Sequence, residues 1–242
     1  MAKDMCIKAN GVAYVTREKL QCKYPSFSIK YGNDNLHFDT YYSSIDLPES
    51  KFYKRDWKKY ERPEIFKLVH IGSMQNDRKG QKRLINILDK LIKEGYSVNL
   101  LFVGDGKLLE DLKKYSIDKK LEKYIEFKGN ISNTEVFNVL SNADLFVLPS
   151  SSEGLPRSII EAMATSLPCV ASNVDGIPEL VEDEYLCEYD NIDGYVKNIK
   201  KFLDNIELMR VVGEKNYFKS KQYSRNELMK RRNIFYEKLK NI

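Results

Sequence analysis

Short apolar runs alternate with longer segments of helical period from Ile65 to the carboxyl terminus, and this alternation constrains the fold more than any other feature. It predicts parallel strands joined by crossover helices. The expected strands are residues 66–71, 97–103, 125–127, 144–148 and 168–171. Several of these runs are apolar almost throughout, which is typical of strands that are covered on both faces. We therefore expect an α/β fold with a Rossmann-like doubly wound parallel sheet.

Helical signals fall between and after these strands. Residues 80–94 carry apolar side chains at the spacing of one buried stripe, and Gly95 ends that helix. Ser132 and Glu135 have the spacing of a capping box, so another helix is expected to begin there. Three further helical stretches follow toward the carboxyl terminus, the last at residues 225–239.

The first 64 residues show a different pattern. Residues 12–16 are typical of a strand and residues 17–24 of a helix, whereas residues 25–62 have little periodicity and many turn residues. A lone strand cannot cover both of its faces, so this region resembles the end of another domain. The expected parts are 1–64, a remnant of an amino-terminal domain with its linker; 65–224, the doubly wound domain; and 225–242, a final helix that crosses back.

The composition excludes several classes of protein. The chain has 242 residues, with 40 Lys and Arg against 35 Asp and Glu and a net charge of +5. Such a chain can bury a core, and no run approaches the roughly 18 apolar residues of a membrane span. The start MAKDMCIKANGVAYVT lacks the features of a signal peptide, so we expect a cytoplasmic protein. Four scattered cysteines and two histidines predict no metal site.

Basic residues cluster at positions 51–59 and again at 230–232. Aromatic neighbours such as Phe52 and Trp57 favour packing of a linker over stacking on bases, so we expect no nucleic-acid partner. A basic patch of this kind also suits contact with an anionic membrane surface, and that alternative stays open.

The segment 144–181, DLFVLPSSSEGLPRSIIEAMATSLPCVASNVDGIPELV, is the most informative about chemistry. A buried strand ends at Pro149, a loop of small residues follows, and Pro156 suits the first position of a helix. The first turn of that helix leaves amides unpaired at the carboxyl ends of the strands, where they favour an anion such as a diphosphate. These amides belong to Leu155, Arg157 and Ser158, and Gly154 allows close approach.

Two carboxylates bracket this turn. Glu153 precedes the helix, and Glu161 lies five residues beyond Pro156, which is roughly 7.5 Å along a helix axis. The two carboxylates therefore suit opposite ends of an extended ligand, and each is able to accept hydrogen bonds from adjacent hydroxyl groups of a sugar. Taken singly, Glu153 is equally typical of a loop charge and Glu161 of a solvated helix residue.

The whole pattern resembles a known family. Glu153, seven intervening residues and Glu161, within EGLPRSIIEAMA and followed by LPCVAS and DGIPELV, resemble the donor-binding motif of the retaining glycosyltransferases of family four. The segment KLVHIGSMQNDRKGQKRLI is similar to the family's first strand and phosphate loop, and VNLLFVGDGKLLEDL to its second strand and helix. The resemblance covers residues 65–223 and implies one half of a GT-B fold with extra carboxyl-terminal helices.

The resemblance also assigns roles to residues. It implies that Glu161 holds the nucleotide ribose, that Glu153 faces the donor hexose, and that Lys79 neutralises the diphosphate. Glu153 and Lys79 are thus the expected catalytic residues. The sugar and diphosphate are lined by Gly154, Leu155 and Pro156, and the base meets the loop at Asn130 and Ile131.

One position departs from the family pattern. Many relatives carry an arginine directly after the glycine of the first strand, but Ser73 stands here after Gly72. We therefore expect Arg78 or another residue to supply the second positive charge beside Lys79. The chain also lacks an Asp-x-Asp triplet, which suits an enzyme that needs no metal and stabilises the leaving diphosphate with amides and cations.

Two further glycine motifs are less informative. The GDG at positions 104–106 lacks the third glycine of a dinucleotide fingerprint, which disfavours an NAD enzyme. The turn at Gly176 and Pro178 has two interpretations. A structural role is favoured, and a contact with a phosphate is the alternative.

The resemblance implies a retaining hexosyltransferase that moves a hexose from a UDP- or GDP-linked sugar to a glycan or lipid-linked acceptor. The expected setting is bacterial surface polysaccharide or lipopolysaccharide synthesis, at the inner face of the membrane. This chain would carry the donor half, and a separate amino-terminal domain would supply the acceptor groups. The alternative is a non-catalytic subunit that binds a nucleotide sugar and needs a partner. A sugar-nucleotide epimerase of the same fold is disfavoured, because the Glu-x7-Glu segment does not indicate the catalytic groups of such an epimerase.

Overall fold

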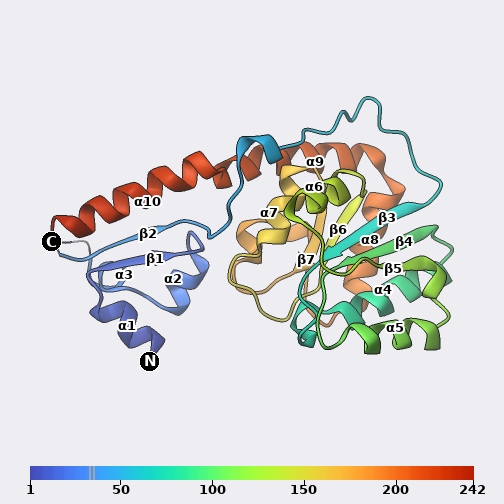
Figure 1. Cartoon of the computed structure of the whole chain (residues 1–242), viewed down its shortest axis with the longest axis horizontal. Coiled ribbons are helices and arrows are strands. Elements are labelled where there is room, and N and C mark those ends of the chain that lie inside the picture. The colour runs from blue at the N-terminus through green and yellow to red at the C-terminus, as the bar shows by residue number, and fades with distance from the viewer. Residues whose placement is uncertain (33, 35) are drawn as a thin grey trace.

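The computed structural model describes residues 1–32, 34 and 36–242, and it has two unequal parts (Figure 1). The larger part is built on a six-stranded sheet in which every pair of neighbours is parallel. In spatial order its strands are β5 Ile125–Phe127, β4 Val98–Val103, β3 Phe66–Ile71, β6 Leu145–Leu148, β7 Cys169–Ser172 and β8 Leu186–Cys187. Strand order reverses between β3 and β6, so a crevice is expected at the carboxyl ends of these two strands.

Helices cover both faces of this sheet (Figure 1). The helix α4 contacts α5 and α8 on one face, and α7 contacts α6 and α9 on the other. Their bounds are α4 Gln81–Lys93, α5 Leu109–Asp118, α6 Asn133–Ser141, α7 Arg157–Ala164, α8 Ile192–Asp204 and α9 Ile206–Ser220. Every residue of β6 and β7 is buried between the two helical layers, which explains why these strands are apolar throughout.

These findings confirm the predicted fold class. The five expected strands are all present, with ends that differ by at most one residue. The capping box is also present, because the Ser132 hydroxyl accepts a hydrogen bond from the Glu135 amide and the Glu135 carboxylate accepts from the Ser132 amide. The sequence analysis missed β8, which has only two residues and no recognisable alternation of its own.

The smaller part is formed by the amino-terminal residues and the end of the last helix. Two parallel strands, β1 Gly11–Tyr14 and β2 Phe38–Tyr41, pair along their whole length. They are accompanied by the helices α1 Ala2–Lys8, α2 Lys19–Lys23 and α3 Phe27–Tyr31. The strand and the helix expected at residues 12–16 and 17–24 are present as β1 and α2, whereas the expectation of a lone strand was wrong, because residues 25–62 also contain α3 and β2. The strand β2 has only four residues, of which Asp39 and Thr40 are polar, so its pairing with β1 rather than its own pattern makes it a strand.

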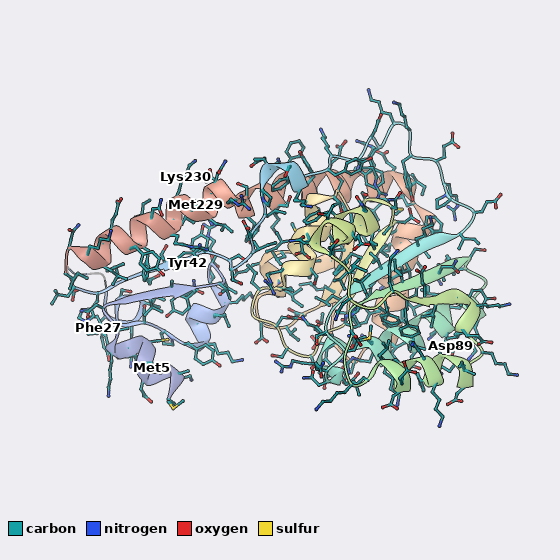
Figure 2. The ribbon with its side chains drawn as sticks, viewed as in Figure 1. Met5, Phe27, Tyr42, Asp89, Met229 and Lys230 are labelled. Carbon is teal, nitrogen blue, oxygen red and sulfur yellow. The ribbon has the colours of Figure 1, made fainter. Side chains whose placement is uncertain are left out.

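The last helix, α10 Arg225–Lys240, joins the two parts. It leaves the larger part and packs on β1 and β2 (Figure 1). The Phe235 ring lies edge-on to Phe38, with centroids 5.4 Å apart, and Tyr42 lies beneath the same helix (Figure 2). The Arg225 side chain also pairs with Asp46 in the chain that leads back to the larger sheet.

The basic stretch before the larger sheet packs against it. Trp57 is buried, and the Arg55 guanidinium lies 5.0 Å from its ring and donates to the Ser141 carbonyl. These contacts match the expected packing of a linker. Among the described residues, no helix combines the length and the apolar character that crossing a membrane requires.

Candidate functional site

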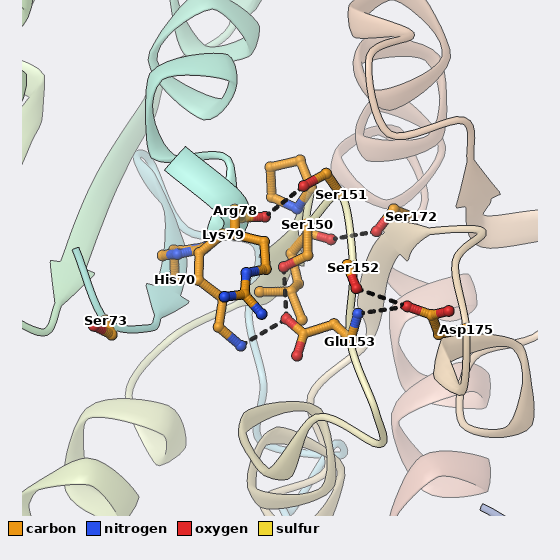
Figure 3. Close-up of polar contacts among 12 residues, drawn as sticks. His70, Ser73, Arg78, Lys79, Ser150, Ser151, Ser152, Glu153, Ser172 and Asp175 are labelled. Atoms are coloured by element: carbon orange, nitrogen blue, oxygen red, sulfur yellow. Dashed lines mark hydrogen bonds and ion pairs between the residues drawn. The ribbon is translucent and has the colours of Figure 1, made fainter. Parts of the chain in front are cut away.

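Two loops meet where the strand order reverses. Residues 72–80 follow β3 and residues 149–156 follow β6. The Ser151 amide donates to the Arg78 carbonyl at 2.8 Å, and the Ser151 hydroxyl donates to the same oxygen at 3.4 Å (Figure 3). A side chain on Gly80 would place its Cβ 2.1 Å from the Pro149 carbonyl oxygen, and the backbone there is left-handed with φ +75°. Only glycine tolerates that combination, so Gly80 allows the two loops to touch.

The first loop presents two basic side chains. The Asn76 carboxamide accepts a hydrogen bond from the Arg78 amide at 3.1 Å and so caps the short turn Asp77–Lys79. Gly80 ends this turn and begins α4. The local sequence therefore fixes Arg78 and Lys79 at the carboxyl end of β3.

Lys79 and Glu153 form the central contact of the site (Figure 3). The Lys79 ammonium lies 2.6 Å from the Glu153 carboxylate, to which the Ser150 hydroxyl also donates at 2.7 Å. The Glu153 side chain is only 8% exposed, so Lys79 offsets the cost of removing this carboxylate from water. The two residues expected to be catalytic therefore contact each other directly.

A hollow of about 270 Å³ lies beside this pair. Its lining includes five residues that the sequence analysis named for the site: Ser73, Arg78, Lys79, Glu153 and Gly154. A larger hollow of about 630 Å³ lies between the β5 side of the sheet and α6, and none of the expected site residues line it. We place the site at the smaller hollow, because it occupies the crevice at the point of reversed strand order.

The helix α7 begins directly after the second loop. Pro156 has extended backbone angles and is the residue before the first turn, one position earlier than expected. No described side chain caps that turn, so its first amides remain available to an anion. The Leu155 side chain is buried in the core, which leaves only its backbone for the site.

Glu161 lies on α7 outside the hollow. Its side chain is partly buried, and no described residue hydrogen-bonds to it. Burial raises the pKa of this carboxyl group, and the nearby Arg157 opposes that rise. A partly buried carboxylate without a partner is costly for a structural residue and typical of one that binds a ligand.

The expected base-contacting loop lies at the same edge of the sheet. Asn130 and Ile131 follow β5, with Asn130 exposed, and neither lines the hollow. The Gly104 amide donates to the Gly129 carbonyl at 2.9 Å and so ties this loop to the end of β4. A Cβ on Gly104 would lie 2.1 Å from the Gly72 carbonyl oxygen, so this glycine of the GDG motif serves close packing of loops.

His70 lies beneath the first loop on β3. It is fully buried, and its Nδ1 lies 3.0 Å from the Val147 carbonyl oxygen, which only accepts hydrogen bonds. Nδ1 therefore carries the proton, while Nε2 has no partner among the described residues. Burial lowers the pKa of His70 to about 4, so this imidazole is neutral at pH 7.

The sequence analysis did not identify Asp175. Its carboxylate accepts hydrogen bonds from the Glu153 amide at 2.9 Å and the Ser152 hydroxyl at 3.0 Å, and it pairs with Lys23 at 3.2 Å (Figure 3). Burial alone raises the pKa of Asp175, but these three donors outweigh it and lower the pKa. An aspartate before glycine is a turn signal, and it gave no indication of a contact 22 residues away.

Within the described part of the chain, no three His, Cys, Asp or Glu side chains are arranged to hold a metal ion. The groups that the site does offer are carboxylates, cations and helix amides. This set suits a ligand with an anionic centre and hydroxyl groups at both ends. The fold and the site thus define an α/β protein with a doubly wound parallel sheet and a polar site where the strand order reverses.

Comparison with known proteins gives the family. The family model described as "Glycosyl transferases group 1" matches residues 50–222, and the chain belongs to this family. Protein CapJ from Staphylococcus aureus is 30% identical over 92% of this chain and 52% of its own length. A UDP-Gal:alpha-D-GlcNAc-diphosphoundecaprenol alpha-1,3-galactosyltransferase from Escherichia coli is 38% identical over 43% of this chain and 28% of its own.

Solved structures agree with the fold. The crystal structure of Anabaena HepE in complex with UDP and glucose superposes with a TM-score of 0.77 at 17% identity, over 100% of this chain and 66% of that one. This likeness supports the GT-B architecture expected from the sequence. The chain spans about half the length of CapJ and a smaller share of the galactosyltransferase.

Proposed function

We propose that this chain is the donor-binding half of a retaining hexosyltransferase. It would take a hexose from a UDP- or GDP-linked sugar and pass it to a glycan or lipid-linked acceptor in bacterial surface polysaccharide or lipopolysaccharide synthesis. The observation that carries this proposal is the arrangement around α7. The Lys79–Glu153 pair precedes the uncapped first turn of α7, and the unpartnered Glu161 lies beyond it.

The arrangement suggests a role for each group. The ribose hydroxyls of the donor would bind Glu161, and its diphosphate would bind the first amides of α7 together with Lys79. The hexose hydroxyls would then bind Glu153. In this proposal the amides and Lys79 stabilise the negative charge that develops on the leaving diphosphate, which is the largest contribution they are able to make to the rate.

The relatives support the substrate classes. The name of the E. coli relative states a UDP-linked galactose donor and a diphosphoundecaprenol-linked acceptor. The solved relative from Anabaena holds UDP and glucose. For this chain we propose the same classes, a nucleotide-linked hexose and a glycan or lipid-linked acceptor at the cytoplasmic face of a membrane, with acceptor groups from a separate amino-terminal domain.

A transfer experiment tests the reaction. The chain is incubated with ¹³C-labelled UDP-glucose, UDP-galactose, UDP-GlcNAc or GDP-mannose and a lipid-linked saccharide acceptor, with and without a polypeptide that supplies the acceptor domain. NMR then reports the anomeric configuration of the product. We expect retention of configuration, and loss of product in Glu153→Gln. A product of inverted configuration would contradict the mechanism. Binding without transfer in either mixture would assign the chain to the alternative, a non-catalytic nucleotide-sugar subunit.

A further inference from the structure

The turn at residues 175–179 connects the two parts of the molecule beside the site. We name it the coupling turn. Sequence analysis favoured a structural role for it, and the structure shows what it holds. The short helix Ile177–Glu179 lies within it, between the loop that carries Glu153 and the amino-terminal segment.

Glu179 holds the amino-terminal segment. Its carboxylate accepts hydrogen bonds from the backbone amides of Arg17, Glu18 and Lys19, at 2.6, 2.8 and 2.7 Å. The Glu18 and Lys19 amides lie at the start of α2, so a residue about 160 positions away adds acceptors there to the Thr16 hydroxyl, which accepts from the Leu20 amide at 2.9 Å. Three donors on one carboxylate fix the orientation of the segment as well as its distance.

Asp175 holds the loop of the site at the other end of the coupling turn. One carboxylate oxygen accepts from the Glu153 amide and the Ser152 hydroxyl, and the other pairs with Lys23 on α2. The Asp175 backbone is left-handed, with φ +45°. Asp175 adopts this less favourable conformation while its side chain bridges the two parts.

Gly176 keeps the three segments in contact between these carboxylates. A Cβ at this position would lie 2.1 Å from the Gly154 carbonyl oxygen and 2.6 Å from the Thr16 side chain. The coupling turn is therefore packed against the site loop and against the amino-terminal segment at one point. A shift of either segment would displace the other.

We propose that Asp175 and Glu179 are positioning residues that make the geometry of the Glu153 loop depend on the docking of residues 15–23. The donor site then has its binding shape only while the amino-terminal segment is held by the coupling turn. The effect on donor binding rests on the proposed function, whereas the effect on the loop does not.

The test measures amide hydrogen exchange by NMR on the full chain, in the parent and in Glu179→Gln. Exchange of the Arg17, Glu18 and Lys19 amides is expected to accelerate, because an uncharged carboxamide cannot accept three backbone hydrogen bonds. The decisive readout is the Glu153 amide, which is expected to exchange about tenfold faster. Amides of β6 report global stability and are expected to keep their parent protection.

Two further variants complete the design. Glu182→Gln is the matched control, because Glu182 pairs only with the exposed Lys215 among the described residues and lies outside the coupling turn. It is expected to leave the Glu153 amide unchanged. Lys23→Met changes an exposed side chain and removes the ion pair with Asp175 together with the contact of the ammonium with the Tyr24 ring. It is expected to fold and to accelerate Glu153 exchange by a smaller factor.

Each outcome decides the proposal. Faster exchange at Glu153 in Glu179→Gln and Lys23→Met, with β6 unchanged, supports coupling. Faster exchange at residues 17–19 with an unchanged Glu153 amide in both variants overturns it. Calorimetry with UDP-glucose on the same samples is expected to show weaker binding where Glu153 exchanges faster. If the parent binds no nucleotide, the proposed function fails, and the exchange data still decide the coupling.

Discussion

The two parts of this molecule differ in how they are stabilised. The larger part buries β6 and β7 completely between two layers of helices. Most residues of α7 also belong to this core, and only its polar residues Arg157, Ser158 and Glu161 are not fully buried. Within the residues that the structure describes, the amino-terminal segment of the smaller part has two strands of four residues each and three helices of at most seven. A two-stranded sheet is only marginally stable by itself in water. The smaller part therefore depends on α10 and on the coupling turn.

This difference bears on function because the site lies at the boundary. Lys79, Gly80 and the start of α7 are set by the rigid sheet, whereas the Glu153 loop also contacts the amino-terminal segment through Asp175. For the donor proposed above, the contacts with the nucleotide are thus expected to be preformed. Contacts with the transferred sugar are expected to depend on how the smaller part is docked.

Core substitutions give the largest expected difference between the two parts. Phe146→Ala, on β6, is expected to destabilise the protein by about 3–5 kcal/mol, because it leaves a cavity in a fully buried strand. Phe235→Ala, on α10, is expected to accelerate amide exchange in β1 while β6 keeps its protection. Urea unfolding and hydrogen exchange measure the two effects. Equal loss of protection in β1 and β6 upon Phe235→Ala would show one cooperative unit instead.

The second effect is a pH dependence that arises from His70 in the larger part. Because the folded-state pKa of His70 is about 4, below the ordinary value of 6.5, the unfolded chain binds the extra proton first as pH falls. The contribution of the neutral His70 to the free energy of unfolding is fully present above pH 6.5. It is lost as pH falls toward 4, with a slope of up to about 1.4 kcal/mol per pH unit. His70→Asn is expected to remove that slope in urea unfolding between pH 7 and 5. An unchanged slope would assign it to other groups.

Removal of one partner from the Lys79–Glu153 ion pair tests how the site at the boundary between the two parts is stabilised. Lys79→Met leaves the Glu153 carboxylate buried with fewer donors, and we expect a loss of about 1–3 kcal/mol. The double variant Lys79→Met with Glu153→Gln is expected to regain most of this stability, since no buried charge remains. Thermal unfolding of the four proteins gives the coupling energy. Additive losses would show that the two residues do not interact.

The smallest expected effect is a gain in stability. Burial raises the pKa of Glu161 in the folded protein above the ordinary value of a glutamate. The free energy of unfolding therefore falls as pH rises from that ordinary value through the folded-state pKa, because the carboxyl group must then be charged while it is partly buried. Glu161→Gln is therefore expected to stabilise the protein at pH 7 by about 1 kcal/mol or less, and to weaken nucleotide binding. A melting temperature below that of the parent at pH 7 would show that Glu161 is structural.

Sequence reasoning succeeded where a segment's own residues determine its structure. The apolar run of β6, the capping box at Ser132 and the loop and helix after Pro149 were all predicted, because each reports burial or backbone chemistry locally. It failed for β2, whose strand depends on a partner 27 residues earlier in the chain. It also missed the roles of Asp175 and Glu179. A turn signal in the sequence does not indicate which distant amides will donate hydrogen bonds to the carboxylates of the turn.

The most direct test of the central claim is calorimetry of the chain with UDP, GDP and ADP, supported by thermal unfolding. A ligand at about a hundred times its dissociation constant stabilises the folded state by about 2.7 kcal/mol, which a melting curve resolves. We expect one nucleotide to bind the parent and to lose its effect in Glu161→Ala, while the variant stays folded. Equal binding by the parent and by Glu161→Ala, or no binding of any nucleotide by the folded parent, would contradict a donor site at α7.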